Sequence, residues 1–282
     1  MIEAKDIITY YNQTHLGYRL FWGLDQAFSM HYGLADDRHQ KHVDKVLNLI
    51  RHLALAVNIN ENDEVLDVGC GFGGSTIWLA ENIGCRVTGI DINPKEINFA
   101  RKQAHKRGIE DRVRFIEMDY REMDKRLGME SYSVVWQIET LIYTDRRKFA
   151  INAARLLREN GRIVIADYFA RPGFFKPEEK RLLRHWITGW GGEGHLATED
   201  EFVQYLRQAG FSDIHFENRS KDVMSSSRRM VKVGCFTTPI GMVLDKVRLR
   251  TPLQTAHSRG GLLQYSALKQ GLWIYGILSG KK

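Results

Sequence analysis

Short apolar runs alternate with helical segments in the middle of the chain. Five runs have the length and composition of buried strands, at 64–68, 86–91, 113–116, 133–136 and 163–166. Between them apolar residues recur at helical spacing, as in a predicted helix from about Arg146 to Arg158, which Asn160-Gly161 would end. Strands that alternate with helices predict a parallel sheet covered on both faces.

The two ends of the chain differ from this middle part. Residues 1–60 have helical periodicity and an aromatic-rich segment that includes Tyr11, Phe21 and Trp22. After residue 170 the pattern predicts more helices and two further strands, at 214–217 and 272–278. We therefore predict an α/β fold with a doubly wound, mainly parallel, seven-stranded Rossmann-like sheet. Its parts are an N-terminal helical lid segment (1–60), a cofactor-binding core (61–170) and a remainder that completes the sheet and carries an inserted helical lid (171–282).

Composition limits the classes of partner. Hydrophobic residues make up 43% of the chain, yet no run of eighteen apolar residues exists, so no transmembrane segment is expected. The three cysteines, Cys70, Cys85 and Cys235, form no CxxC pair, which favours a reducing, cytoplasmic setting. The net charge of +7 is scattered along the chain, so no nucleic-acid partner is expected. A homodimer remains open.

A glycine-rich turn carries the clearest chemical signal. It reads Asp67-Val68-Gly69-Cys70-Gly71-Phe72-Gly73-Gly74 and lies between the first predicted strand and a helix. Glycines allow a sharp turn and a close approach of backbone to ligand, at the strand ends where open α/β sheets bind ligands. Asp91 ends the second predicted strand, where a carboxylate can accept the hydroxyls of a ribose. Asp119 follows the third, where it could meet an adenine amino group.

A nicotinamide-dependent dehydrogenase is an alternative at this turn. Its GxGxxG fingerprint can be placed on Gly69, Gly71 and Gly74. Asp67 at the strand end, which suits the amine of a methionine, and the second carboxylate, Asp119, weigh against it. A protein that binds the cofactor without catalysis is a further alternative.

Four segments together resemble the class I S-adenosylmethionine-dependent methyltransferases. The segment 65–74 resembles their motif I, 89–93 their acidic second motif, 118–120 their adenine-contact motif, and 157–162 the turn before their fifth strand. The resemblance implies S-adenosylmethionine as the cofactor of the 61–170 core. The cofactor-binding residues we expect are Tyr11, Asp67, Gly69, Gly71, Gly73, Asp91, Ile92, Asp119, Tyr120 and Gln137.

The ends of the chain resemble a subgroup of that family. Tyr10-Tyr11, Trp22 and 31–33 are similar to the N-terminal part of sterol, tocopherol and prenyl-diphosphate C-methyltransferases. The segment 137–140 is similar to their acidic segment after strand four, although Tyr143 stands where they usually carry a histidine. The resemblance implies a small lipophilic acceptor, with an isoprenoid, sterol-like or quinone-like carbon. A small-amine acceptor, as in phosphoethanolamine-type N-methyltransferases, is the alternative.

Three side chains are candidates for catalysis. Glu139 stands just past the fourth predicted strand, where it could take a proton from the acceptor. Tyr143 and His31 are placed beside the acceptor by the same resemblance. His39 and His42 are spaced for one face of a helix, which a solvated surface explains, so no metal site is expected.

Overall fold

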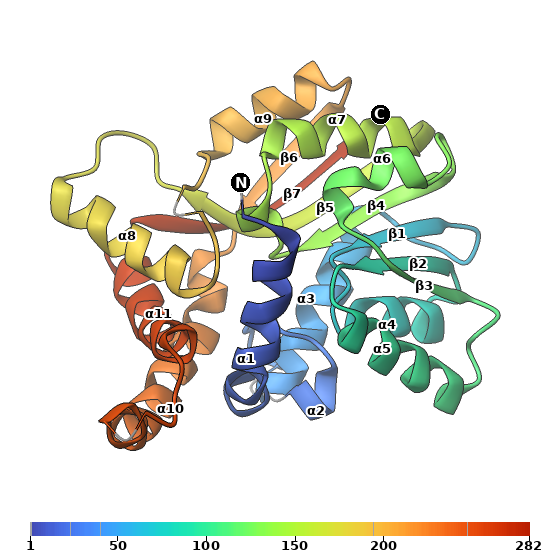
Figure 1. Cartoon of the computed structure of the whole chain (residues 1–282). Helices are drawn as coiled ribbons and strands as arrows, with labels where there is room; N and C mark the ends of the chain where they lie inside the picture. Colours follow the sequence, from blue (N-terminus) through green and yellow to red (C-terminus); the bar gives the residue numbers. More distant parts are fainter. Residues whose placement is uncertain (1, 23, 40, 194, 247) are drawn as a thin grey trace.

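A seven-stranded sheet forms the centre of the protein. The computed structural model describes residues 2–22, 24–39, 41–193, 195–246 and 248–282, and the side chains of Phe21 and Trp22 lie outside this description. The strands are β1 (Glu64–Val68), β2 (Arg86–Asp91), β3 (Val113–Glu117), β4 (Tyr132–Ile138), β5 (Leu157–Ala170), β6 (Ser212–Asn218) and β7 (Trp273–Lys281). They lie in the order β3-β2-β1-β4-β5-β7-β6, as Figure 1 shows.

The predicted fold class is confirmed. Strands β1 to β5 pair in parallel, whereas β7 runs antiparallel between β5 and β6. The strand order reverses between β1 and β4, because β2 and β3 lie on one side of β1 and β5 lies beyond β4. In open α/β sheets such a switch point opens a crevice at the carboxyl ends of the strands.

The predicted end of one helix was wrong. The helix expected at 146–158 is α7 (Arg146–Leu156), and Leu157 already pairs with Tyr132 of the neighbouring strand. Asn160 has a left-handed backbone (φ 61°) inside β5, where the pairing register with β4 shifts. An asparagine-glycine pair therefore marks an irregular strand here rather than the end of the helix.

Helices cover both faces of the sheet. On one face lie α3 (His42–Ala56), α4 (Gly74–Asn82) and α5 (Pro94–Arg107). On the other lie α6 (Met123–Arg126), α7 and α9 (Glu199–Gln208), with the short turns η1 (Tyr120–Glu122) and η2 (Leu141–Tyr143) at the strand ends. Local sequence sets several boundaries: Asn93 caps α5 ahead of Pro94, and Thr198 forms a capping box with Glu201 on α9.

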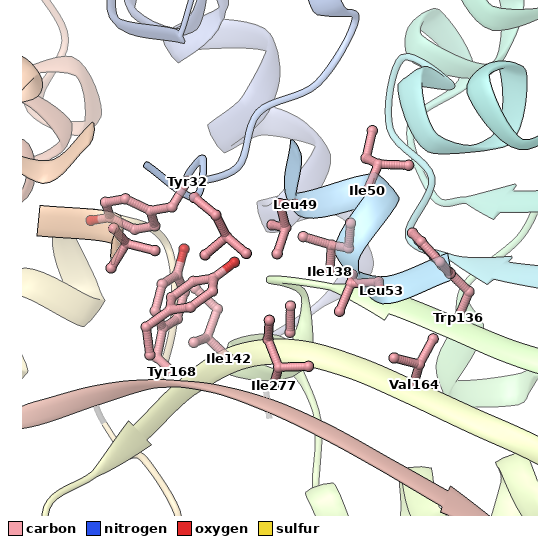
Figure 2. Close-up of a cluster of buried hydrophobic side chains, with 14 of the residues drawn as sticks. Tyr32, Leu49, Ile50, Leu53, Trp136, Ile138, Ile142, Val164, Tyr168 and Ile277 are labelled. Atoms are coloured by element: carbon pink, nitrogen blue, oxygen red, sulfur yellow. The ribbon is translucent and has the colours of Figure 1, made fainter. Parts of the chain in front are cut away.

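The apolar stripe of α3 packs directly on the sheet. Leu49, Ile50 and Leu53 are fully buried against side chains from β4 and β5, such as Trp136 and Val164 (Figure 2). Their spacing is that of one helix face, in line with the helical periodicity of residues 1–60, so burial of this face stabilises the layer.

The remaining helices form a layer at the edge of the sheet. They are α1 (Ala4–Trp22), α2 (Leu24–Ala27), α8 (Pro177–Gly189), α10 (Ser220–Lys246) and α11 (Pro252–Lys269). Helices α8 and α11 approach closely, since a Cβ on Gly189 would lie 2.7 Å from the Ala256 carbonyl oxygen. On α11, Gln254 donates to the Gln13 carbonyl of α1 over 3.0 Å, and Figure 1 shows both helices beside the strand ends. None of the described helices is long and apolar enough to cross a membrane.

Candidate active site

The glycine turn links β1 to α4 and supports a pocket at the switch point. The amides of Gly69 and Cys70 both donate to the Ile90 carbonyl oxygen, over 2.9 and 3.0 Å. Gly69 has a φ of 76°, and a Cβ there would lie 2.4 Å from the Thr140 methyl carbon. This position therefore requires glycine, both for its backbone and for the close approach of the segment after β4.

Segments far apart in the sequence line this pocket. The sheet contributes the ends of β1, β2, β3 and β4, and the segment before α3 covers them. The predicted site residues that line it are Tyr11, His31, Asp67, Gly69, Gly71, Asp91, Ile92, Asp119, Tyr120, Glu139 and Tyr143. The structure thus brings eleven of the thirteen together.

Gly73 and Gln137 lie apart from the pocket lining. Gly73 is the residue before α4, and a Cβ on it would lie 2.8 Å from that of Ala100. Gln137 is buried in the sheet, where its amide nitrogen donates to Asp167 over 2.8 Å and to the Thr140 hydroxyl over 3.0 Å. Both residues have a packing or positioning role in this structure.

Three carboxyl groups, of which Asp67 and Glu96 are buried and Asp91 is half-buried, gather at the turn without a basic partner in the described hydrogen bonds. Asp91 accepts from the amides of Gly71 and Asn93 over 3.0 and 2.8 Å. Asp67 accepts from the Thr76 hydroxyl over 2.7 Å. Burial raises the pKa of Asp67 to about 7, and burial also raises the pKa values of Asp91 and Glu96. Such a cluster favours a ligand that brings positive charge and hydrogen-bond donors.

The end of β3 adds a polar rim. Asp119 lines the pocket, and its carboxylate accepts from the Arg121 side chain at distances down to 2.6 Å. Arg121 also donates to the Ile2 carbonyl oxygen over 2.6 Å, which fixes the start of the chain beside the pocket. Next to it, the Tyr120 hydroxyl donates to the Thr140 carbonyl oxygen over 2.7 Å. This rim joins β3, the start of the chain and the segment after β4.

Glu139 is held by three donors from separate segments. Its Oε1 accepts from the Tyr32 amide and the Tyr275 hydroxyl, both over 2.7 Å, and its Oε2 accepts from the Tyr168 hydroxyl. Its own backbone is left-handed, with a φ of 55°, and its amide bonds the Ala166 carbonyl oxygen over 2.8 Å. Burial nevertheless raises the pKa of Glu139 to about 8, because the three bonds compensate only part of the lost hydration.

A smaller cavity, here called the inner chamber, adjoins this carboxyl group. Its walls are Tyr11, Tyr18, Met30, Glu139, Ile142, Tyr143, Tyr168 and Trp190, four of which also line the larger pocket. The Tyr143 hydroxyl donates to the Trp190 carbonyl oxygen over 2.8 Å and lies 3.0 Å from the Tyr11 hydroxyl. Aromatic rings thus enclose the one carboxyl group of the chamber.

His31 presents a hydrogen-bond acceptor to the larger pocket. Its Nδ1 lies 2.7 Å from the Tyr32 carbonyl oxygen, so Nδ1 carries the proton. Its Nε2 is buried and has no hydrogen-bond partner among the described residues. Burial lowers the pKa of His31 to about 4, so the ring is neutral near pH 7 and the lone pair on the buried Nε2 has no donor among the described residues.

Sequence reasoning missed the tyrosines that hold Glu139. Tyr168 lies just past the predicted fifth strand, and that position at a carboxyl strand end was a usable signal. Tyr275 lies on the antiparallel β7 and Tyr32 on a loop, and neither position carries a local signal for this contact. Among the described residues, no group of three or more histidine, cysteine or acidic side chains is arranged to hold a metal ion.

Comparisons with known proteins agree with this architecture. The family model for a methyltransferase domain matches residues 65–161. The 27-O-demethylrifamycin SV methyltransferase of Amycolatopsis mediterranei is 31% identical over 218 residues, covering 74% of this chain and 77% of that protein. The geranyl diphosphate 2-C-methyltransferase of Saccharopolyspora erythraea is 28% identical over 58% of this chain and 62% of its own length.

Solved structures share the fold at low sequence identity. A putative sarcosine dimethylglycine methyltransferase from Galdieria sulphuraria has a TM-score of 0.79 and 16% identity. The match covers 96% of this chain and 98% of that one, so the sheet and the added helices are both shared.

Proposed function

Because this chain belongs to the class I S-adenosylmethionine-dependent methyltransferase family, we propose that it methylates a small, largely apolar acceptor. The leading class is an isoprenoid, sterol-like or quinone-like molecule methylated at carbon. The observation that carries this proposal is the inner chamber, where aromatic rings surround Glu139 beside the cofactor pocket. Membership of this family overturns the dehydrogenase interpretation of the glycine turn.

The residues of the larger pocket fit S-adenosylmethionine. That cofactor supplies a methyl group on a positively charged sulfur, which makes a good leaving group. In our proposal Asp91 receives the ribose hydroxyls, since it lies at the end of β2 with both oxygens already oriented by backbone amides. Asp67, buried and short of positive partners in the described contacts, receives the methionine amine. Asp119 and Tyr120 form the adenine end, and Ile92 packs beside it.

The chain's own residues then position the acceptor and exclude water. Tyr11, Tyr143 and Trp190 wall the chamber, so an acceptor inside it is desolvated and oriented toward the pocket. Ring faces attract positive charge, and they stabilise a cation that develops on an alkene carbon during methylation. Glu139 lies within the same chamber and accepts the proton that the methylated carbon loses.

A small amine is the second candidate acceptor. A carboxyl group with aromatic rings around it also suits an ammonium group, and Glu139 would then act as a general base. The Galdieria structure carries the name of an amine methyltransferase on the same fold. The carbon acceptor ranks first because the chamber walls other than Glu139 are aromatic or apolar side chains.

Methyl transfer from labelled S-adenosylmethionine tests the proposal. The purified protein is incubated with lipid extract in one arm and with a panel of small primary, secondary and tertiary amines in the other. We expect label in the lipid arm that depends on Glu139 and is absent in Glu139→Gln. Label confined to the amines would favour the second candidate, and no transfer in either arm would contradict both.

A further inference from the structure

The inner chamber contains no basic side chain among the described residues. Its polar walls are four tyrosines and one glutamate, and its other walls are Met30, Ile142 and Trp190. The larger pocket contributes Arg121, but that guanidinium is already bonded to Asp119 and to the Ile2 carbonyl oxygen at the far rim. Burial raises the pKa of Glu139 to about 8, so the carboxyl group is ionised above that pH. An anionic group inside the chamber would then lie beside the carboxylate with no cation among the described residues to balance it.

The phenolic hydrogen-bond donors of the chamber are committed to protein acceptors. The indole Nε1 of Trp190 has no hydrogen-bond partner among the described residues, but it lies on the side of Gly260 of α11, where a Cβ would be 3.2 Å from it, and Gly260 does not line the chamber. Tyr168 donates to Glu139, and Tyr143 donates to the Trp190 carbonyl oxygen over 2.8 Å. Tyr11, 3.0 Å from the Tyr143 hydroxyl, then donates to Tyr143. The Tyr18 hydroxyl lies 3.2 Å from that of Tyr10, beyond the chamber wall.

A chain of donors continues from Tyr10. Its hydroxyl lies 2.8 Å from His257 Nδ1, so donation from Tyr18 to Tyr10 and from Tyr10 to His257 satisfies both phenols. With His257 Nδ1 as the acceptor, all four phenolic protons of the chamber are directed at protein acceptors. A phosphate or carboxylate, which needs several donors when it leaves water, would find none of these protons available.

Two hydrogen-bond acceptors of the protein, by contrast, are not fully used by the described residues. Oε2 of Glu139 receives one hydrogen bond among the described contacts, and a carboxylate oxygen can accept two. Nε2 of His31 is buried and unpartnered where it lines the adjoining pocket. As far as the described residues show, the inner chamber offers lone pairs and ring faces rather than free phenolic protons or positive charge.

We infer that the acceptor enters the inner chamber through a neutral hydrogen-bond donor or a cationic group, and that acceptors phosphorylated at this end are excluded. The inference rests on the proposed function and restricts the class of methyl acceptor. Among isoprenoids it selects alcohols or quinols over diphosphates, and among amines it selects free amines over phosphorylated ones. The site would discriminate against phosphorylated acceptors mainly because it cannot stabilise their negative charge.

Matched probe pairs test the inference on the protein saturated with S-adenosylhomocysteine. Calorimetry at pH 9, above the pKa of Glu139, compares geraniol with geranyl diphosphate, and choline with phosphocholine. We expect the unphosphorylated member of each pair to bind on the order of 100-fold more tightly, since like charges placed together cost several kcal/mol. Glu139→Gln should narrow that ratio, because it removes the opposing carboxyl group. The exposed Glu61→Gln makes the same chemical change outside the site and should leave the ratio unchanged.

Each outcome decides the inference. Equal or tighter binding of either phosphorylated probe would overturn it, and so would the failure of both geraniol and choline to bind. A ratio that is unaffected by Glu139→Gln would also count against the chamber as its origin. The proposed function fails separately: a protein with the expected binding ratios that transfers no methyl group from S-adenosylmethionine to lipids or amines would retain the charge selectivity alone.

Discussion

Replacing Glu139 with glutamine separates its chemical role from its structural one. The amide oxygen can still accept from the Tyr32 amide, and the side chain keeps its size within the ring of tyrosines. The ionisable carboxyl group is lost, so methyl transfer should fall by about 10²- to 10⁴-fold. Affinity for S-adenosylhomocysteine should stay close to that of the unmodified protein, since Asp67 and Asp91 are untouched.

The same substitution should stabilise the protein at high pH. Burial raises the pKa of Glu139 from 4.5 to about 8, so the folded protein holds this proton more tightly than the unfolded chain. Between those two pH values the unfolding free energy therefore falls as pH rises. At 1.36 kcal/mol per pKa unit the full cost is roughly 5 kcal/mol, reached near pH 8 and absent below pH 4.5.

Urea unfolding at pH 5.5 and pH 8.5 measures this effect. Glutamine does not titrate, so the stability of Glu139→Gln relative to the unmodified protein should rise by roughly 3 kcal/mol between these conditions. Glu61→Gln, an exposed carboxyl-to-amide change, should show no such rise. Parallel pH dependence of Glu139→Gln and the unmodified protein would refute the reasoning, because it would mean that Glu139 titrates normally in the folded state.

Three further substitutions test the cofactor pocket and its support. Asp91→Ala should weaken binding of S-adenosylhomocysteine by roughly 10- to 100-fold in calorimetry, through loss of hydrogen bonds to a carboxylate; an unchanged dissociation constant would remove Asp91 from the site. Gly69→Ala should lower both melting temperature and cofactor affinity, because its Cβ would lie 2.4 Å from a Thr140 carbon, while Gly108→Ala, also at positive φ but with open space around it, should spare the affinity. Equal loss of affinity in the two alanine variants would contradict this. Asp167→Ala removes the carboxylate that lies 3.4 Å from the buried guanidinium of Arg146, and it should lower the free energy of unfolding in urea by about 3–5 kcal/mol. A decrease below about 1 kcal/mol would show that this ion pair contributes little.

The positions of the strands and of the glycine turn could be predicted because their signals are local. Each of the seven predicted strand segments lies in a strand of the sheet, apart from Leu272, which precedes β7. Carboxyl ends of neighbouring parallel strands meet at one edge, so the sequence also placed Asp67, Asp91 and Asp119 near one pocket. The end of α7 was misplaced because Asn160-Gly161 satisfies a helix stop and a strand irregularity equally well.

The direction of the Gln137 side chain could not be predicted from the sequence pattern. Its place at the end of β4 is next to the pocket, yet side chains alternate across a strand, and its amide instead reaches Asp167 inside the sheet. The direction of a side chain at a strand end depends on the neighbouring strands and on the turn that follows.

By itself, the sequence determined the family, the parallel sheet and the carboxylates of the cofactor pocket, since periodicity, turns and strand ends depend on adjacent residues. Only the tertiary structure decided the character of the acceptor end. Tyr32, Tyr168 and Tyr275 come from three distant segments and converge on Glu139, and burial among them raises its pKa. The pKa of that carboxyl group and the engagement of the phenolic donors around it depend on long-range packing, because desolvation is a property of everything that surrounds a group.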